Sequence, residues 1–282
     1  MTLTVEQQEA AVSKHYGLDN LMDLITAGLE KAGKDVRALK VDDLAGVDEF
    51  HTRGRAATTE LAALADIQKD TKVLDVGCGL GGTARHFAAT YGCSVTGIDL
   101  TKEYIEVGTK LNELVSLENK VTLKTASALE LPFEDSSFDV VWTEHVQMNI
   151  EDKKKFYSEI ARVLRPGGTF LFHDIFRGPK ETEPVYPTPW AEVGSLSKVA
   201  TVPDVQDIFK TCGLNLENWT DKSVESAGFF KKVLIKVSAD GFPPVSIGLL
   251  MRETAKAKLE NYCTNVEDGR LVVALGMAKK EA

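Results

Sequence analysis

Residues 73–82, VLDVGCGLGG, decide the fold of this chain. An apolar run ends at Asp75, and glycines then crowd the next seven positions. Side chains on such a turn would keep a ligand away from the amides at the start of the following helix. The pattern therefore predicts a buried strand, a tight turn and a helix whose N-terminus faces a ligand. The glycines are Gly77, Gly79, Gly81 and Gly82.

Beyond this stretch, apolar strand-like runs alternate with helical patterns. Such alternation predicts a mostly parallel sheet with helices on both faces. We expect the fold class α/β, a Rossmann-like, doubly wound sheet of seven strands. The expected strands lie at 72–77, 94–100, 121–127, 138–145, 169–175, 214–221 and 270–280, and the expected helices at 81–91, 101–117, 151–164 and 203–212.

The chain before the first strand is predicted to be helical, at 4–33 and 55–67. We expect a helical cap over residues 1–65 and a ligand-binding domain over residues 66–282. Helical, apolar sequence also precedes the last strand. Segments expected to cover a substrate lie near 176–200 and 223–263, and the second of these is equally suited to a dimer surface.

Composition narrows the class of partner. The chain has 282 residues and a formal net charge of −9. This negative charge argues against nucleic acid or anionic lipid as the main partner, so we expect a small-molecule partner. The four cysteines form no CxxC pair and no Cys/His cluster with metal-ligand spacing, so no metal is expected. The N-terminus carries no secretory pattern, and no apolar run approaches the ~18 residues of a membrane span. We expect a soluble protein in the cytoplasm.

Two cofactors fit the glycine turn. Gly77, Gly79 and Gly82 match the dinucleotide fingerprint, and Asp99 lies where such a fold keeps its ribose-binding acid. S-adenosylmethionine (SAM) uses the same strand, turn and helix. A carboxylate at Asp75 would repel a pyrophosphate but suits the sulfonium and ammonium of SAM. Asp99 does not discriminate, because both cofactors contain the ribose.

Four stretches within roughly residues 70–176 resemble, in order, the motifs of the class I SAM-dependent methyltransferases. They are VLDVGCGLGG, VTGIDL, ALELPFEDSSFDVVW and EIARVLRPGGTFLFHDI. The resemblance implies SAM as cofactor and methyl transfer rather than hydride transfer. It places Thr52, Arg53 and Gly54 near the SAM carboxylate. The other residues that it implies for the cofactor are Asp75, Gly77, Cys78 and Gly79 around the methionine part, Asp99 at the ribose, Leu100, Ser127, Ala128 and Leu129 around the adenine, and Glu144 beside the sulfonium.

One position departs from the family pattern. Members commonly carry an aspartate before the alanine at 128, where it accepts a hydrogen bond from the adenine amino group. This chain has Ser127 there. A serine oxygen accepts the same bond without charge, so one adenine contact is in question.

A narrower resemblance is carried by FHTRGRAATTELA at 50–62, EHVQMNI at 144–150, and FHDIF followed by YPTPWA. These stretches are similar to the methyltransferases that act on glycine, sarcosine and dimethylglycine. The resemblance implies methyl transfer to a small amine or amino acid, in the direction of glycine betaine synthesis.

The polar side chains around the expected methyl-transfer point are the candidate chemical groups. His145 and His173 are the catalytic candidates, although methyl transfer to a tertiary amine requires no base. Arginine suits a substrate carboxylate because its guanidinium binds both oxygens. The substrate-binding candidates are His51, Gln147, Asn149, Arg177 and Trp190.

Three alternatives remain. A C- or O-methyltransferase acting on a quinone or other lipid-like acceptor would need a wide apolar pocket, whereas a zwitterion would need a converging arginine. A SAM-binding protein without turnover and a dehydrogenase are the other two. A homodimer is possible.

Overall fold

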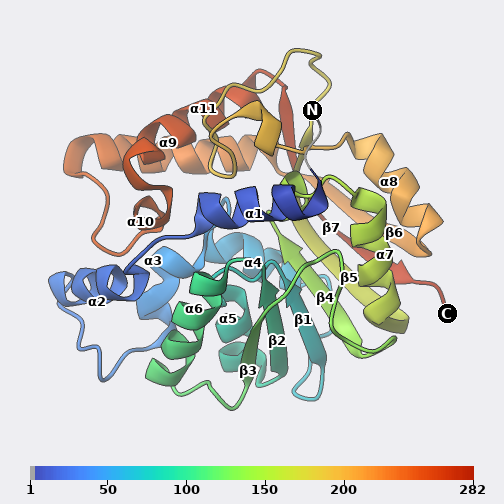
Figure 1. Cartoon of the computed structure of the whole chain (residues 1–282), viewed down its shortest axis with the longest axis horizontal. Coiled ribbons are helices and arrows are strands. Elements are labelled where there is room, and N and C mark those ends of the chain that lie inside the picture. The colour runs from blue at the N-terminus through green and yellow to red at the C-terminus, as the bar shows by residue number, and fades with distance from the viewer. Residues whose placement is uncertain (1–3) are drawn as a thin grey trace.

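The computed structural model describes residues 4–282, and a seven-stranded sheet forms their centre (Figure 1). The strand order is β3-β2-β1-β4-β5-β7-β6. β7 runs antiparallel to both of its neighbours, and the other neighbouring pairs are parallel. The prediction of a doubly wound, mostly parallel sheet is therefore confirmed. The strands are β1 Lys72–Val76, β2 Ser94–Asp99, β3 Val121–Thr125, β4 Phe138–Glu144, β5 Leu164–Arg177, β6 Leu214–Asp221 and β7 Leu271–Lys280.

Helices cover both faces of the sheet because successive residues of a strand point to opposite sides. Leu74 and Val76 pack into one apolar cluster with α7 and α8, and Val73 packs into another with α4 and α5. The helices are α1 Val5–Tyr16, α2 Leu21–Lys31, α3 Ala45–Asp48, α4 Arg55–Ala62, α5 Gly82–Tyr91, α6 Lys102–Leu114, α7 Lys153–Val163, α8 Val202–Thr211, α9 Ser223–Asp240, α10 Ile247–Met251 and α11 Ala255–Glu267.

The register of the strands brings polar residues together at one edge. Asp75 is paired with Trp142 across β1 and β4, and Glu144 is paired with His173 across β4 and β5. Asp99 is the last residue of β2. The carboxyl ends of these parallel strands lie at the same edge of the sheet. The carboxylates and the His173 imidazole therefore lie together at the edge where ligands of such folds bind.

The N-terminal part and the insertion before β7 meet over that edge. In Figure 1, α1 crosses the upper ends of the strands, with α9 and α11 above it and α10 to its left. Helix α1 is held there by the Tyr16 hydroxyl, which donates to Asn149 Oδ1 at 2.9 Å, and by His15, whose Nε2 lies 3.1 Å from Pro189 O. Among residues 4–282, no helix is long and apolar enough to cross a bilayer.

Three element boundaries differ from the expectations. The helix expected at 4–33 is two helices, α1 and α2, because the chain turns after Tyr16 and Asn20 adopts the left-handed region with φ 58°. The helix expected at 55–67 ends at Ala62, and β5 begins at Leu164 rather than 169. The division into 1–65 and 66–282 stays a prediction, and residues 1–3 of the expected cap lie outside the described residues.

Candidate active site

The turn after β1 has backbone angles that favour glycine. Gly77 and Gly79 have φ of 76° and 54°. A Cβ on Gly77 would lie 2.5 Å from a Val146 methyl group, so an alanine there would be strained in both backbone and packing. The amides of Gly77 and Cys78 both donate to Ile98 O, at 2.8 and 2.9 Å. The turn is thus tied to the end of β2.

Two carboxylates flank this turn. Asp99 accepts the Gly79 amide at 2.9 Å through Oδ2 and the Thr101 amide at 2.8 Å through Oδ1. Asp75 is buried, and its Oδ2 has no hydrogen-bond partner within residues 4–282. Burial, followed by the charges of Glu144 and Asp99, raises the pKa of Asp75 well above its usual range. An unpaired buried carboxylate of this kind is suited to a cationic ligand group.

A cavity of about 310 Å³ opens beside these carboxylates. Helix α1 contributes Glu9 and Tyr16 to its wall, and the turn after β1 contributes its backbone. Most of the predicted site residues lie in this wall. They are His51, Asp75, Gly77, Cys78, Gly79, Asp99, Leu100, Ser127, Ala128, Leu129, Glu144, His145, Asn149 and Trp190.

Five predicted residues lie outside the wall. The Arg53 guanidinium pairs with Glu60, and Gly54 is the residue before α4. Arg177 pairs with Glu183 at 3.1 Å, so neither arginine converges on the cavity as expected. Each guanidinium is instead paired with a nearby glutamate, and Nη1 of Arg53 is buried without a partner among residues 4–282.

The other two are buried behind the wall. The Gln147 amide N–H donates to Asp174 Oδ2 at 3.1 Å, and its side chain donates to Ile175 O. These bonds fix Gln147 as part of the scaffold after β4, where it holds the loop rather than a substrate. His173 is fully buried but contacts wall residues through Thr52, described below.

Glu144 is the centre of the polar network. Its Oε2 accepts hydrogen bonds from Trp142 Nε1 at 3.0 Å, from the Thr83 hydroxyl at 3.0 Å and from the Thr58 hydroxyl at 3.1 Å. His51 Nε2 lies 3.4 Å from the same oxygen. Burial raises the pKa of this carboxyl, but the His51 charge and His173 together hold it below its usual value.

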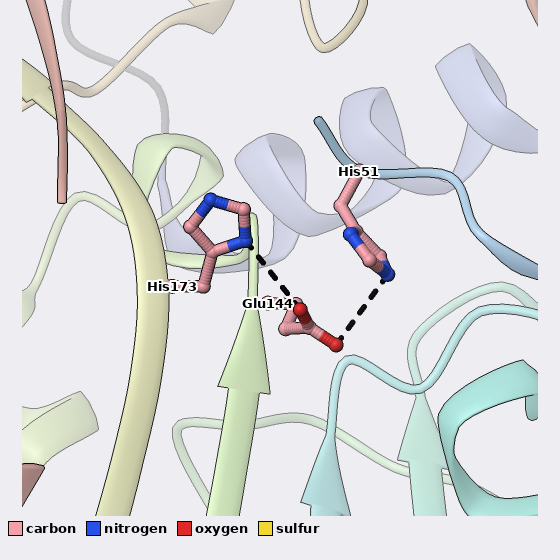
Figure 2. Close-up of side chains that lie close together, drawn as sticks. All are labelled: His51, Glu144 and His173. Carbon is pink, nitrogen blue, oxygen red and sulfur yellow. Dashed lines mark ion pairs between the residues drawn. The ribbon is translucent and has the colours of Figure 1, made fainter. Parts of the chain in front are cut away.

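Three histidines surround the network (Figure 2 shows His51 and His173 on either side of Glu144). Burial lowers the pKa of His51, but Glu144 and Glu49 outweigh it and raise the pKa to about 9. Burial lowers the pKa of His145 well below its usual value, and the charges of His173 and His51 act in the same direction. His145 is thus a neutral imidazole in the cavity wall, which is the form that accepts a proton.

Thr52 joins the histidines. Its hydroxyl lies 3.4 Å from His173 Nε2 and 3.5 Å from His145 Nε2, and it donates to Ser226 Oγ at 3.3 Å. His145 itself has φ 55°, and its amide donates to His173 O at 2.8 Å. A non-glycine residue in this conformation is held by its surroundings, and such residues cluster at functional sites.

Two groups of wall residues were not named from the sequence. Glu9 of α1 accepts the Ser127 hydroxyl, so a carboxylate stands where the family pattern has an aspartate at 127. The other group is a set of apolar side chains from elements around the sheet edge, five of them in the segment 223–263 that was expected to cover a substrate. Its members include Phe50, Met148, Ile175, Phe230, Ile247, Leu250, Met251 and Tyr262.

Acidic side chains outnumber basic ones in the wall, where His51, with its raised pKa, is held between Glu144 and Glu49. The wall contains seven carboxylate residues and, among residues 4–282, no lysine or arginine. Such a cavity favours cationic or uncharged ligands and disfavours ligands with a net negative charge. The carboxylate residues are Glu9, Asp48, Asp75, Asp99, Glu144, Glu151 and Asp152.

Comparisons with known proteins agree with this architecture. Residues 74–172 match the family model described as a methyltransferase domain. Glycine/sarcosine/dimethylglycine N-methyltransferase of Actinopolyspora halophila is 33% identical over 127 residues, 45% of this chain and 22% of that protein. Chloroplastic tocopherol O-methyltransferase of Arabidopsis thaliana is 39% identical over 104 residues, 37% of this chain and 30% of that protein.

The chain spans about half or less of the length of the first curated relatives that it matches. Among solved structures, geranyl diphosphate C-methyltransferase from Streptomyces coelicolor A3(2), in complex with Mg²⁺, geranyl diphosphate and S-adenosyl-L-homocysteine, shares the fold with a TM-score of 0.72 at 15% identity. The match covers 99% of both chains. Residues 74–172 therefore carry a methyltransferase domain, and the chain resembles a glycine/sarcosine/dimethylglycine N-methyltransferase over 127 residues.

Proposed function

We propose that this protein transfers the methyl group of SAM to a small organic acceptor that carries no anionic group. The observation that carries the proposal is the unpaired, buried Asp75 at the end of β1, in a cavity wall without a described lysine or arginine. SAM brings two cationic groups to such a wall. A dinucleotide would bring a pyrophosphate to it, so the dehydrogenase alternative is disfavoured.

The wall residues have complementary roles toward SAM. Asp99 is positioned at the end of β2 to accept the ribose hydroxyls, while its bonds to the Gly79 and Thr101 amides hold it in place. Glu9, beside Ser127, supplies an acceptor for the adenine amino group. Asp75 would face the ammonium of the methionine part. Helix α1 therefore contributes to cofactor recognition as well as covering the edge of the sheet.

The shape and charge of the remaining wall bear on the acceptor. A zwitterionic amino acid such as sarcosine needs a cation for its carboxylate, and both candidate arginines are paired with glutamates and are not part of the cavity wall. The apolar side chains from α9, α10 and α11 suit an apolar or aromatic body instead. We therefore favour an acceptor of the C- or O-methyltransferase type, with a hydroxyl or an activated carbon. A simple amine without a carboxylate is the second candidate, because aromatic and carboxylate side chains both attract cations.

The chemistry requires mainly positioning. Methyl transfer is an in-line displacement, and orientation of the two reactants contributes up to ~7–11 kcal/mol in favourable systems. With a hydroxyl acceptor, neutral His145 would take the proton as the oxygen bonds to the methyl carbon. The C–S bond breaks, and sulfur keeps the electron pair to give S-adenosylhomocysteine.

The test is a coupled assay for S-adenosylhomocysteine release, together with calorimetry of SAM binding. The acceptors are sarcosine, dimethylglycine and ethanolamine in one set, and a simple phenol, a prenylated quinol and an isoprenoid alcohol in the other. We expect SAM binding and saturable turnover in the second set. Turnover on sarcosine or dimethylglycine would refute the charge argument. Absence of SAM binding would refute the proposed activity itself.

A further inference from the structure

His51, Glu144 and His173 form a compact cluster of potential metal ligands. They come from the loop before α4 and from the ends of β4 and the middle of β5, and one ligand atom of each lies within 4.8 Å of the others. His51 Nε2 is 3.4 Å from Glu144 Oε2, and His173 Nδ1 is 3.4 Å from Glu144 Oε1. Figure 2 shows both imidazoles turned toward the carboxylate between them.

Two atoms of the cluster lack a good partner in the protein. His173 Nδ1 is fully buried and has no hydrogen-bond partner within residues 4–282. Glu144 receives its three close donors on Oε2, whereas the Thr58 hydroxyl is 3.5 Å from Oε1. An imidazole nitrogen and a carboxylate oxygen therefore face each other across 3.4 Å without a well-formed bond. Buried polar atoms are rarely left in this state.

The surroundings of the cluster match those of a metal site. His51 Nδ1 lies 3.3 Å from Thr52 O, and a bond donated to this carbonyl leaves the Nε2 lone pair directed at the cluster. His173 Nε2 lies 3.4 Å from the Thr52 hydroxyl, which is placed to fix this ring in the same way. Metal-binding histidines are generally oriented by such partners on their second nitrogen, and metal-binding carboxylates by hydrogen bonds such as those on Glu144.

We propose that His51 Nε2, His173 Nδ1 and the Glu144 carboxylate bind one divalent transition-metal ion at the cavity wall. Two atoms that are each about 2.1 Å from an ion lie about 3.4 Å apart when the angle between them is close to tetrahedral. The two nitrogen–oxygen separations have this value. Two imidazoles with one carboxylate favour Zn²⁺ or Fe²⁺ over Mg²⁺, which prefers oxygen ligands, and they leave positions open.

The open positions would face the cavity, because His51 and Glu144 lie in its wall. Metal binding stands on the geometry alone, but its use in catalysis rests on the proposed function. An acceptor hydroxyl bound to the ion would lose its proton more readily, and His145, in the same cavity wall, offers a ring nitrogen to take it. The resulting oxygen would attack the methyl carbon as the C–S bond breaks. The competing state is a metal-free ion pair in which a protonated His51 bridges Glu144 and Glu49, whose Oε2 is 3.0 Å from His51 Nε2.

The decisive experiment measures metal binding without SAM or acceptor. The full chain is dialysed against a chelator, then equilibrated separately with Zn²⁺, Co²⁺ and, without oxygen, Fe²⁺, and bound metal is counted by elemental analysis. We expect one ion per chain and, with Co²⁺, visible absorption bands of a site with four or five ligands. His173→Ala and Glu144→Gln should each lower binding at least tenfold. His86→Ala is the matched control, since His86 lies on α5 and contacts Arg55, and this variant should bind metal like the wild type.

Each result has a defined meaning. Fewer than 0.2 ions per chain for all three metals would overturn the proposal and support the ion-paired state. Binding that survives both substitutions would also overturn it, because the ion would lie elsewhere. If His173→Ala fails to fold, as judged by circular dichroism, His51→Gln takes its place. Metal binding without turnover on any acceptor would refute only the proposed function, whereas full turnover in chelator would refute only the catalytic use of the metal.

Discussion

The pair Arg85–Asp48 joins α3 of the N-terminal part to α5, the helix after β1, and its removal is the most informative test of how the cavity is held. Both side chains are fully buried. The guanidinium donates to Asp48 Oδ1 at 2.5 Å and Oδ2 at 3.2 Å, and also to Asn112 Oδ1 at 2.8 Å. Burial raises the pKa of Asp48 even though Arg85 opposes the shift. Without its partner, this carboxylate would be a buried, uncompensated charge.

The magnitude follows from that contrast. Removing one member of a buried ion pair typically costs about 3–5 kcal/mol, whereas replacing both members by uncharged groups of similar size is often close to neutral. We therefore expect Arg85→Met to lower the free energy of unfolding by about 4 kcal/mol and the melting temperature by roughly 10 °C. Asp48→Asn should also lower the free energy of unfolding. The double variant should lose at least about 2 kcal/mol less than the summed losses of the two single variants.

Urea unfolding followed by circular dichroism measures these values. The matched control is Arg165→Met, because Arg165 pairs with Asp139 at the surface at 2.6 Å and its side chain is 60% exposed. This control should change stability by less than about 1 kcal/mol. Additive effects in the double variant, or an Arg85→Met effect no larger than the control, would refute the reasoning.

Four further outcomes are expected. Asp99→Asn should weaken SAM binding about 30-fold by calorimetry, because it removes charge-assisted acceptors worth about 2 kcal/mol. Glu9→Gln should weaken it about fivefold if α1 supplies the adenine contact, and an unchanged affinity would contradict that role. SAM binding should release protons, since a cation lowers the raised pKa of Asp75, and calorimetry in buffers of different ionisation enthalpy measures this release. The hydrogen bond from Arg162 lowers the pKa of Glu159 to about 2, against 4.5 in the unfolded chain. The stabilisation that ionised Glu159 gives the folded protein is therefore present above pH 4.5 and is lost as the pH falls through 2. Glu159→Gln should reduce the pH dependence of the free energy of unfolding in that window by on the order of 3 kcal/mol.

The parts of the fold that follow from local pattern were predicted well. The order of strands and helices, the glycine turn and the carboxylate at the end of β2 depend on hydrophobic periodicity and on short-range backbone geometry. The break between α1 and α2 was missed, although Gly17 and Asn20 are a local signal for it. A closer weighting of these two residues would have found the break, because both favour conformations outside a helix.

The contents of the cavity wall were less predictable because they depend on tertiary contacts. Ser127 and Glu9 are 118 positions apart, and only the path of α1 brings them together. Arg53 and Arg177 had the right chemistry for a carboxylate, but sequence does not reveal that Glu60 and Glu183 occupy them. The same limitation hid the metal-ligand geometry, since His51 approaches Glu144 and His173 from a loop that no spacing rule connects to β4 or β5.

The acidic wall and the helical cover belong to one physical arrangement. Carboxylates collected in an apolar cavity repel one another, and burial disfavours their charged forms, as the raised pKa values of Asp75 and Asp99 show. An arrangement of this kind loses stability in the empty protein and regains it when cationic groups bind. Helix α1 adds the Glu9 carboxylate to the wall and covers the site. It therefore increases the repulsion between the carboxylates and also keeps out water that would screen this repulsion. Cation binding and closure by α1 should therefore reinforce each other.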